Sequence, residues 1–343
     1  MNQVSEYLRL QKCFIIAEVA QSHDGSLGMA HSFIDAAASC GADAIKFQTH
    51  FADQESTLSE PWRVKFSYED DTRFEYWQRM EFTPEQWFGL KDHADEKGIM
   101  FLSSPFSIKA VELLERMDME AWKIASGELS NAPMLERIYT TSKPVIISSG
   151  MSQLSELDEL IDTLKTHKLE HAILQCTTAY PTPPEKIGLN NLALFRDRYQ
   201  CPVGLSDHSG EIYSGLAAVA LGAKILEVHL ALSKAMFGPD VVASLDIPQL
   251  TELVKGVRFI ESALSNDIDK DAFAETMKPL KNIFTKSIVA QREIQQGEVL
   301  KLEDLGFKKP GTGMPASDYI NIIGKKLNKT VKFDHFFTDG DFE

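Results

Sequence analysis

The sequence predicts an α/β protein: a parallel (β/α)8 barrel, or TIM barrel, followed by a small C-terminal β-rich domain. Three observations predict this fold. Eight short apolar runs alternate with amphipathic segments, polar residues follow the runs, and β-like runs punctuated by Gly and Pro replace the alternation near residue 270. The 343 residues also suit one barrel of about 250 residues with a small appendage.

The eight apolar runs have the length and composition of buried strands. They cover residues 14–19, 43–48, 99–103, 121–126, 144–149, 171–176, 202–207 and 224–229. Gly41, Gly98 and Gly222 come just before three of these runs, and a Gly just past a helix is the usual left-handed C-cap. Each of these glycines therefore marks the end of a helix and the start of a strand. An open, doubly wound sheet shows the same alternation, but the number of runs favours the barrel.

The segments between the runs have helical periodicity. In residues 26–40 the apolar side chains that recur at helical spacing are Leu27, Ala30, Phe33, Ile34 and Ala37. The connection after the second run, residues 49–85, is long and rich in aromatic and charged residues. Such a segment either borders a binding site or packs over the barrel rim, and we assign it only a shaping role.

The chain divides into three predicted parts. Residues 1–265 form the barrel, residues 266–284 form a polar linker with a short helix, and residues 285–343 form the small domain. A domain of this size cannot build a large core alone, so we expect it to dock on another surface.

Composition and charge exclude several classes of partner. Hydrophobic residues make up 43% of the chain and charged residues 25%, which is ordinary for a globular protein. A net charge of -15 argues against a nucleic-acid surface, because a polyanion requires clustered Lys and Arg. No run approaches the roughly 20 apolar residues of a membrane helix, and the N-terminus lacks the pattern of a secretion signal. Four separated cysteines without a CxxC pair indicate reduced thiols and a cytoplasmic location.

Polar residues gather where the predicted strands end. The active sites of such barrels lie at the carboxyl ends of the strands. The polar residues at these ends include Glu18, Lys46, Gln48, Ser104, Lys123, Ser126, Glu128, Ser148, Ser149, Thr178, Ser206, His208, Glu227 and His229. A solvated turn explains one such ending, whereas eight endings of this kind indicate a site.

His208 and His229 follow the seventh and eighth predicted strands, so the barrel brings them close together. A single His at a strand end is usually a hydrogen-bonded structural residue. Two of them on neighbouring strands, with Glu18 and Glu227 nearby, favour a divalent metal site instead. Imidazole and oxygen ligands suit Mn, Fe, Co or Zn, and the residues alone do not rank these ions.

Lys46 and Lys123 are the lysines at the strand ends, and burying them is costly unless an anion pairs with them. Serine hydroxyls and backbone amides nearby would complete a cradle for a phosphate or carboxylate group. A Schiff base on either lysine is the alternative, and the apparent metal site favours anion binding. Glu18 and Glu128 either exchange protons with a substrate or form inert ion pairs with the lysines.

Read together, these residues resemble the sialic acid synthase family, which comprises N-acetylneuraminate synthase and related nonulosonic acid synthases. The matching stretches, in order, are FIIAEVAQSHDG, GADAIKFQT, FLSSPF, WKIASGE, VIISSGM, LQCTTAYPTP, GLSDHSG, ILEVHL and FGPDVVASL. Residues 287–315 resemble the C-terminal domain of these enzymes, an antifreeze-like (SAF) domain of the β-clip type. The resemblance covers nearly the whole chain.

The resemblance implies condensation of phosphoenolpyruvate with an N-acylhexosamine, either N-acetylmannosamine or a diacetamido hexose, to give a nonulosonic acid and phosphate. His208 and His229 would bind a divalent metal, Mn2+ in the family, that polarises the sugar aldehyde. The substrate-binding positions would be Lys46, Ser104, Lys123, Ser126, Ser148, Thr178, Ser206 and Lys309. The positions that handle protons, water or the sugar would be Glu18, Gln48, Glu128, Tyr180 and Asp240. The family also implies a domain-swapped homodimer, in which the small domain of one chain caps the barrel of the other.

Four departures from the family pattern lie on the sugar side. Ser22 begins SHDG where the family has NHNG or NHEG, Thr178 replaces an Asn, and Val241 replaces the His of GPDH. Lys309 stands where the capping domain presents an Arg, and Lys lacks the planar fork of Arg. The acceptor sugar therefore stays open. The alternative functions are a barrel synthase that condenses phosphoenolpyruvate with an aldose phosphate, and a sugar-binding protein without catalysis.

Overall fold

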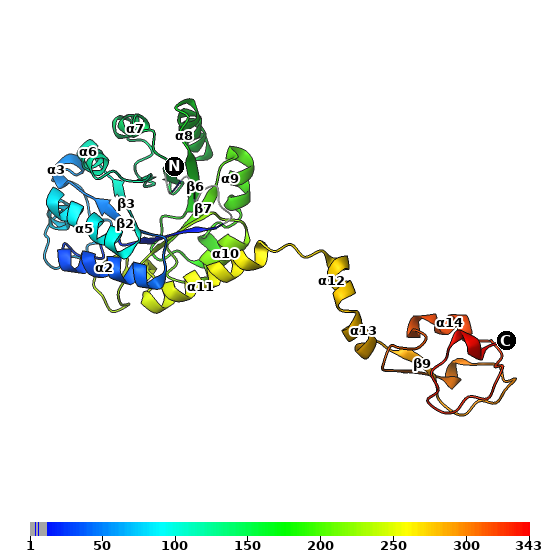
Figure 1. The fold of residues 1–343 in the computed structure, drawn as a ribbon. Coiled ribbons are helices and arrows are strands. Elements are labelled where there is room, and N and C mark those ends of the chain that lie inside the picture. The colour runs from blue at the N-terminus through cyan, green and yellow to red at the C-terminus, as the bar shows by residue number, and fades with distance from the viewer. Residues whose placement is uncertain (1–3, 5, 7–11) are drawn as a thin grey trace. The chain divides into compact units, whose positions relative to one another are not determined.

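The computed structural model describes residues 12–343 together with Val4 and Glu6. The chain forms two compact units, one ending at Asn266 and the other running from Asp267 to Glu343 (Figure 1). We refer to them as the barrel unit and the C-terminal unit. Among the residues described, no helix combines the length and the apolar character that a membrane span requires.

The barrel unit contains eight parallel strands arranged in a ring. The strands are β1 (Phe14–Glu18), β2 (Ala44–Thr49), β3 (Met100–Pro105), β4 (Trp122–Ile124), β5 (Val145–Ser148), β6 (His171–Cys176), β7 (Val203–Asp207) and β8 (Ile225–His229). Hydrogen bonds join them in the order β3-β2-β1-β8-β7-β6-β5-β4, and β3 contacts β4. The first strand thus pairs with both the second and the last. This arrangement confirms the predicted barrel and excludes an open sheet.

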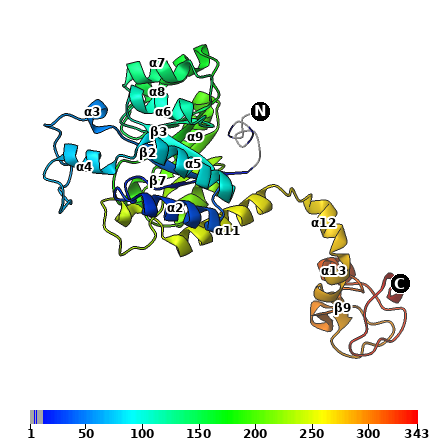
Figure 2. The same ribbon diagram turned by 60° about the vertical axis from the view of Figure 1, so that its left-hand side comes forward.

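Helices surround this ring (Figures 1 and 2). They are α2 (Leu27–Cys40), α5 (Pro84–Lys97), α6 (Ile108–Arg116), α7 (Ala132–Tyr139), α8 (Leu154–Thr166), α9 (Asn191–Tyr199), α10 (Tyr213–Ala220) and α11 (Ile247–Leu264). The apolar residues predicted for one face of α2, including Ala30, Phe33 and Ile34, are buried. Gly41 and Gly98 end α2 and α5 in the left-handed conformation, with φ of 79° and 69°, as the sequence predicts.

The register of the strands sets which polar side chains are neighbours. Glu18 of β1 stands beside Lys46 of β2 on one side and beside His229 of β8 on the other. Ser206 of β7 stands beside Glu227 of β8. Side chains two residues apart on a strand point to the same face, so Glu227 and His229 share one face of β8. The ring therefore collects residues from distant parts of the sequence at its carboxyl end.

The segment between β2 and α5 is more than the long loop expected from its irregular mixture of aromatic and charged residues. It contains two helices, α3 (Ala52–Glu55) and α4 (Arg73–Met80), which are labelled in Figure 2. Thr72 and Glu75 form a capping box that begins α4. This local capping signal, rather than a long apolar periodicity, accounts for the helix.

The C-terminal unit begins with two short helices, α12 (Lys270–Thr276) and α13 (Lys278–Phe284), where the sequence predicts only one. Met277 ends the first helix. Pro279 occupies the first turn of the second, where a proline is tolerated because the N–H groups there have no intrahelical partner. A proline at this point therefore divides the predicted helix in two.

The rest of the C-terminal unit is β-rich, as predicted. β9 (Ser287–Ala290) pairs antiparallel with β10 (Leu305–Lys308), and isolated bridges such as Val289 to Phe336 bind the later segments to them. A short helix, α14 (Tyr319–Ile322), lies between two of these segments. The small core consists of Ile288, Ala290, Ile294, Leu300, Leu305, Ile322, Leu327, Val331 and Phe337.

Candidate active site

Two lysines lie inside the barrel near the carboxyl ends of their strands. Lys46 on β2 and Lys123 on β4 are each only 2% exposed. The Lys46 ammonium lies 2.6 Å from Glu18 Oε2 and 3.9 Å from Glu227 Oε2. The Lys123 ammonium lies 3.5 Å from Glu227 Oε1. Glu227 on β8 is therefore the carboxylate that both lysines share.

Burial and charge act on these four groups in opposite directions. Burial would raise the pKa of Glu227, but the ammonium groups of Lys123 and Lys46 outweigh it and lower this pKa well below its usual range. Burial raises the pKa of Glu18, and the single ammonium of Lys46 opposes this only in part. Burial also lowers the pKa of Lys123. The centre thus combines two ammonium groups with one ionised carboxylate and a second carboxyl group that can hold a proton near neutral pH.

Serine hydroxyls surround the two ammonium groups. The Lys123 ammonium donates to Ser148 Oγ at 2.7 Å, and the Lys46 ammonium donates to Ser104 Oγ at 3.3 Å. Ser206 Oγ donates to the carboxylate that the lysines share, at 3.0 Å. Ammonium and hydroxyl groups this close together supply several hydrogen-bond donors, which suit the oxygens of a phosphate or carboxylate group.

Ser126 lies in the loop after β4, where the loop after β5 comes unusually close. A Cβ built on Gly150 would lie 2.0 Å from Ser126 Cβ and 3.3 Å from Thr178 Oγ1. Gly150 also has a φ of +33°, a conformation that other residues rarely adopt. A glycine at this position therefore lets the loops after β4, β5 and β6 meet beside the serines.

His208 and His229 lie next to each other, with their ring centroids 5.0 Å apart. His208 Nδ1 lies 2.8 Å from the carbonyl oxygen of Thr177, which can only accept, so Nδ1 carries the proton and Nε2 offers a lone pair. The Tyr180 ring stacks on His208 at 4.3 Å, with its hydroxyl 3.3 Å from Nε2. Burial lowers the pKa of each histidine to about 4, so both rings are uncharged at neutral pH.

The two imidazoles fit the ligand requirements of a divalent metal ion. Neutral imidazole is a common ligand for transition metals, and Nδ1 of His229 is buried without a hydrogen-bond partner. In the described part of the chain, no group of three or more His, Cys, Asp or Glu side chains is arranged to hold a metal. An ion bound by His208 and His229 would therefore take its remaining ligands from water or from a substrate.

A chain of polar contacts runs outward from Glu18. Gln48 Nε2 donates to Glu18 Oε1 at 2.8 Å, and Gln48 Oε1 accepts from Gln21 at 2.6 Å. Gln21 also lies 2.9 Å from His50 Nε2, and His50 Nδ1 lies 2.5 Å from Glu55 Oε1. These contacts hold the Gln48 carboxamide with its nitrogen toward Glu18.

A cavity of about 620 Å³ adjoins these groups, and we call it the mouth cavity. The predicted site residues that line it are Gln48, Ser126, Glu128, Thr178, Tyr180, His229 and Asp240. Other predicted site residues belong to the same group through the contacts described above. They are Glu18, Lys46, Ser104, Lys123, Ser148, Ser206 and His208. Lys309 is the exception, because it belongs to the C-terminal unit, where its ammonium lies 5.0 Å from the centre of the Phe284 ring.

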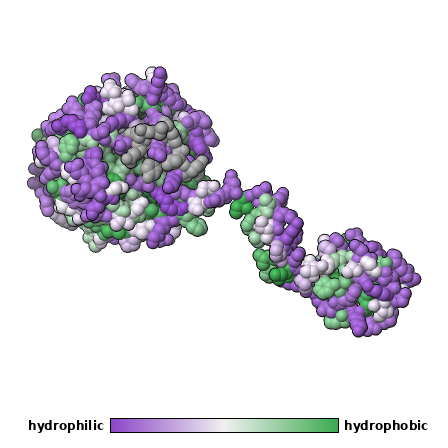
Figure 3. All heavy atoms as spheres, viewed as in Figure 1, coloured by the Kyte–Doolittle hydropathy of each residue, from purple (hydrophilic) through white to green (hydrophobic). Residues whose placement is uncertain are grey.

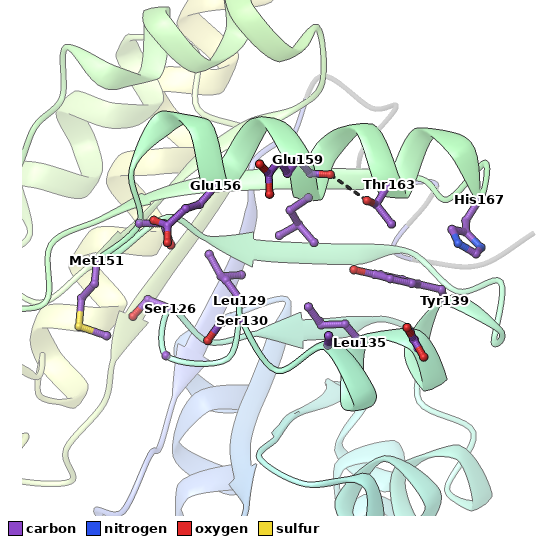
Figure 4. Close-up of a pocket in the computed structure, with 15 residues that line it drawn as sticks. Ser126, Leu129, Ser130, Leu135, Tyr139, Met151, Glu156, Glu159, Thr163 and His167 are labelled. Carbon is purple, nitrogen blue, oxygen red and sulfur yellow. Dashed lines mark hydrogen bonds between the residues drawn. The ribbon is translucent and has the colours of Figure 1, made fainter.

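A second cavity, of about 630 Å³, lies between α7 and α8 (Figure 4). Ser126 and Met151 lie at one end of it, and Tyr139 and His167 lie at the other. Its lining residues include three glutamates but no lysine or arginine. An anionic substrate would meet like charges there, so the lysine centre in the barrel is the better anion site.

Two residues of the barrel centre, Gln21 and His50, had no assigned role in the sequence analysis, and Glu227 was expected only beside the two histidines. Glu227 is one of the polar residues at the strand ends, but its contact with both lysines depends on closure of the barrel. His50 directly follows β2 and Gln21 lies three residues after β1, and this position at the strand ends is the signal that points to them.

Comparison with known proteins gives consistent matches over both units. The NeuB family profile matches residues 33–269, and the SAF domain profile matches residues 285–343. The chain is 34% identical to N,N'-diacetyllegionaminic acid synthase of Campylobacter jejuni subsp. jejuni, over 96% of this chain and 100% of that one. It is 36% identical to N-acetylneuraminate-9-phosphate synthase of Homo sapiens, over 94% of this chain and 90% of that one.

A solved structure of similar architecture is the crystal structure of N-acetylneuraminic acid (sialic acid) synthetase from Leptospira borgpetersenii. Its TM-score with this chain is 0.69 and its sequence identity is 28%. The match covers 79% of this chain and 93% of that one. The similarity therefore extends from sequence to fold.

Proposed function

Because the chain belongs to the NeuB family and ends in a SAF domain, we propose that it condenses phosphoenolpyruvate with an N-acylated amino sugar. The products would be a nonulosonic acid, which is a nine-carbon 2-keto acid, and inorganic phosphate. The chain is a sialic acid synthase-like enzyme, and the reaction forms a carbon–carbon bond.

The observation that supports this reaction best is the pair of buried ammonium groups on Lys46 and Lys123. Phosphoenolpyruvate carries a phosphate and a carboxylate, and the lysines with their neighbouring serine hydroxyls supply donors for both. Glu227 is the only carboxylate within reach of both ammonium groups in the described residues. The positive charge that remains when Glu18 holds a proton is offset by an anionic substrate.

The proposed reaction joins C3 of phosphoenolpyruvate to the aldehyde carbon of the open-chain sugar. The aldehyde oxygen takes up a proton as this bond forms, and C2 becomes electron-poor. Water then adds to C2, and the bond between C2 and the bridging oxygen breaks, which releases phosphate and leaves a keto group. We assign the proton transfer to Glu18, since burial raises its pKa and Gln48 holds it in place.

We assign the metal ligands to His208 and His229. A divalent ion, Mn2+ by resemblance to the family, would supply Lewis-acid activation of the aldehyde when bound. The hydrogen bond from His208 Nδ1 to the Thr177 carbonyl oxygen leaves the lone pair on Nε2, where a metal ion would take the place of the contact with the Tyr180 hydroxyl. Tyr180 and Asp240 line the mouth cavity beside the histidines, and we assign them contacts with the sugar.

The acceptor proposed is N-acetylmannosamine or a diacetamido hexose. The departures from the family pattern on the sugar side do not alter the lysine and histidine centre. Ser22 and Val241 are buried, so they affect the shape of the site through packing, whereas Thr178 lines the mouth cavity directly. The product mass is therefore the measurement that identifies the acceptor.

We also propose that two copies form a homodimer with exchanged C-terminal domains, in which a second copy brings Lys309 to the barrel. The connecting helices α12 and α13 carry an apolar stripe that the C-terminal unit leaves exposed, visible in green on the connecting segment in Figure 3. The stripe consists of Phe273, Met277, Leu280, Ile283 and Phe284. An apolar face of this kind is usually buried against another surface.

The test is to incubate the protein with phosphoenolpyruvate, Mn2+ and a panel of sugars, and to measure phosphate release and product mass. We expect turnover with an N-acylhexosamine and a product whose mass equals that of the sugar plus pyruvic acid. Turnover only with an aldose phosphate would support the alternative barrel synthase. Sugar binding in calorimetry without any turnover would support the non-catalytic alternative.

A further inference from the structure

Arg63 lies between α3 and α4, and its guanidinium reaches the mouth of the barrel. Its central carbon lies 4.8 Å from the centre of the Tyr180 ring, and this ring stacks in turn on His208. Arg63 lines the mouth cavity together with Asp240, and both also line a smaller pocket with Gln21. The long segment after β2 thus places one cation directly over the aromatic stack that covers the histidines.

Among the described residues, Arg63 differs from the other cations of this region in having no carboxylate within ion-pair distance, although its charge acts on the nearby Asp240 carboxyl and opposes the rise of that pKa by burial. Arg73, which also lines the mouth cavity, lies 3.5 Å from Glu60 Oε1. Lys46 and Lys123 are paired with carboxylates deeper in the barrel. Within the described residues, Arg63 forms no ion pair, and its ring contact with Tyr180 is what orients it. Its N–H donors are therefore available to a ligand in the cavity.

We infer that Arg63 is an acceptor-binding residue whose guanidinium donates hydrogen bonds to the oxygen of the sugar's N-acyl group. The inference rests on the proposed function. A guanidinium presents a planar set of N–H donors, and the cation–π contact with Tyr180 positions this group before the sugar arrives. The group that it contacts must therefore be an acceptor of hydrogen bonds in the mouth cavity beside the Tyr180 ring.

The charge of the mouth cavity indicates that the sugar group bound by Arg63 is a neutral acyl group rather than a phosphate. The carboxyl groups that line the cavity are those of Glu55, Glu60, Glu128 and Asp240. They outnumber the two lining arginines, and Arg73 is already paired with Glu60. A phosphate dianion on the sugar would meet net repulsion at this end of the cavity, whereas an acyl group would not. The acceptor is therefore an unphosphorylated sugar.

The experiment compares Arg63→Ala and Arg63→Lys with the matched control Lys65→Ala, which removes an exposed cation from the same segment. KM and kcat are measured for the acceptor identified in the panel and for phosphoenolpyruvate. Arg63→Ala is expected to raise the acceptor KM about tenfold or more, as loss of a hydrogen bond from a charged donor does. The KM for phosphoenolpyruvate should stay within about threefold of wild type, since Lys46 and Lys123 are unchanged.

Arg63→Lys separates the two kinds of acceptor group. A lysine keeps the charge but not the planar fork, so it should restore little of the affinity for a neutral acyl group. Calorimetric titration of the acceptor into each variant gives the same comparison without turnover, and thermal unfolding verifies that each variant is folded.

Three results would overturn the inference. An acceptor KM of Arg63→Ala equal to that of Lys65→Ala would remove the role of Arg63 and leave the proposed function standing. Full recovery by Arg63→Lys, with turnover of a sugar phosphate, would replace the neutral acyl group by an anionic one. If the wild-type protein releases no phosphate with any sugar, the proposed function fails first, and the role of Arg63 fails with it.

Discussion

A Cβ on Gly150 would lie 2.0 Å from Ser126 Cβ, so these two residues fit together only because position 150 carries no side chain. Gly150→Ala is expected to push the loop after β5 away from Ser126. We expect a loss of about 1–3 kcal/mol in the free energy of unfolding and a rise of about tenfold in the KM for phosphoenolpyruvate. Thermal unfolding and steady-state kinetics measure the two effects.

The matched control for this change is Gly89→Ala. Gly89 lies inside α5, and a Cβ there would meet nothing within 4 Å. Alanine favours a helix over glycine, so the control should be neutral or slightly more stable, with unchanged kinetics. Equal behaviour of the two variants would show that the approach of Gly150 to Ser126 has no bearing on the site.

Glu227→Gln should destabilise the barrel unit, because it removes the one negative charge that both buried lysines share. We expect the free energy of unfolding at neutral pH to fall by about 3–5 kcal/mol. Asp158→Asn, which breaks the exposed ion pair with Arg198, should cost less than about 1 kcal/mol. Tryptophan fluorescence during urea unfolding isolates the barrel unit, which holds every tryptophan of the chain: Trp62, Trp77, Trp87 and Trp122. Similar losses in both variants would contradict the assignment of Glu227.

Removal of metal should abolish phosphate release, and added Mn2+ should restore it. The variant His208→Ala/His229→Ala is expected to lose bound metal, as measured by mass spectrometry of the metal content after dialysis. His171→Ala is the control, because His171 begins β6 at the opposite end of the barrel and contacts the Leu169 carbonyl oxygen. Undiminished turnover after a chelator has removed all metal would contradict the proposed metal site.

The C-terminal unit should lose stability in acid because of Asp341. Burial would raise the pKa of this carboxyl, but contacts with Lys329, His335 and Thr338 lower it to about 2. Since this pKa is lower in the folded unit than in the unfolded chain, the stabilisation is complete above about pH 4 and is lost as the pH falls toward 2. Hydrogen exchange of the full chain over residues 285–343 at a series of pH values measures this loss.

Asp341→Asn should remove most of this pH dependence and cost about 1–3 kcal/mol at neutral pH. Asp339→Asn changes an exposed carboxyl two residues away and serves as the control. Protection factors over residues 285–343 that are the same at pH 2 and pH 5, after correction for the intrinsic exchange rate at each pH, would rule out a stabilising role for the Asp341 carboxylate.

The apolar stripe on α12 and α13 predicts the state of assembly. Leu280→Asp is expected to convert a dimer to a monomer, because a charge in a buried apolar interface is unfavourable. Asp271→Ala, outside the stripe, should leave the dimer intact. Size-exclusion chromatography with light scattering measures the molar mass of each variant. A wild-type protein that is monomeric at every concentration would reject the proposed exchange of domains.

The barrel could be predicted from sequence because each of its strands is a buried apolar run followed by polar residues. The runs at 171–176 and 202–207, for example, agree with β6 (His171–Cys176) and β7 (Val203–Asp207) to within one residue. The small helix α4 escaped prediction, since its signal is the capping box of Thr72 and Glu75 and not a long periodicity.

The site shows the same division between local and distant signals. The candidate lysines, histidines and serines come from the strand ends, and the fold rule for barrels is enough to collect them. The position of Glu227 between Lys46 and Lys123 depends on the distances across the closed ring. The contact of Arg63 with Tyr180 depends on the path of an irregular segment, which no periodicity encodes.

The pairing of β1 with β8 also bears on how the enzyme is made in the cell. A ribosome synthesises Lys46 and Lys123 long before it reaches Glu227 and His229, so the emerging polypeptide holds two cationic side chains without their shared counter-ion. Translation that stops before the eighth strand yields a chain with neither a closed ring nor a pair of imidazoles. The ring of strands can therefore close only when translation of the barrel unit is nearly complete.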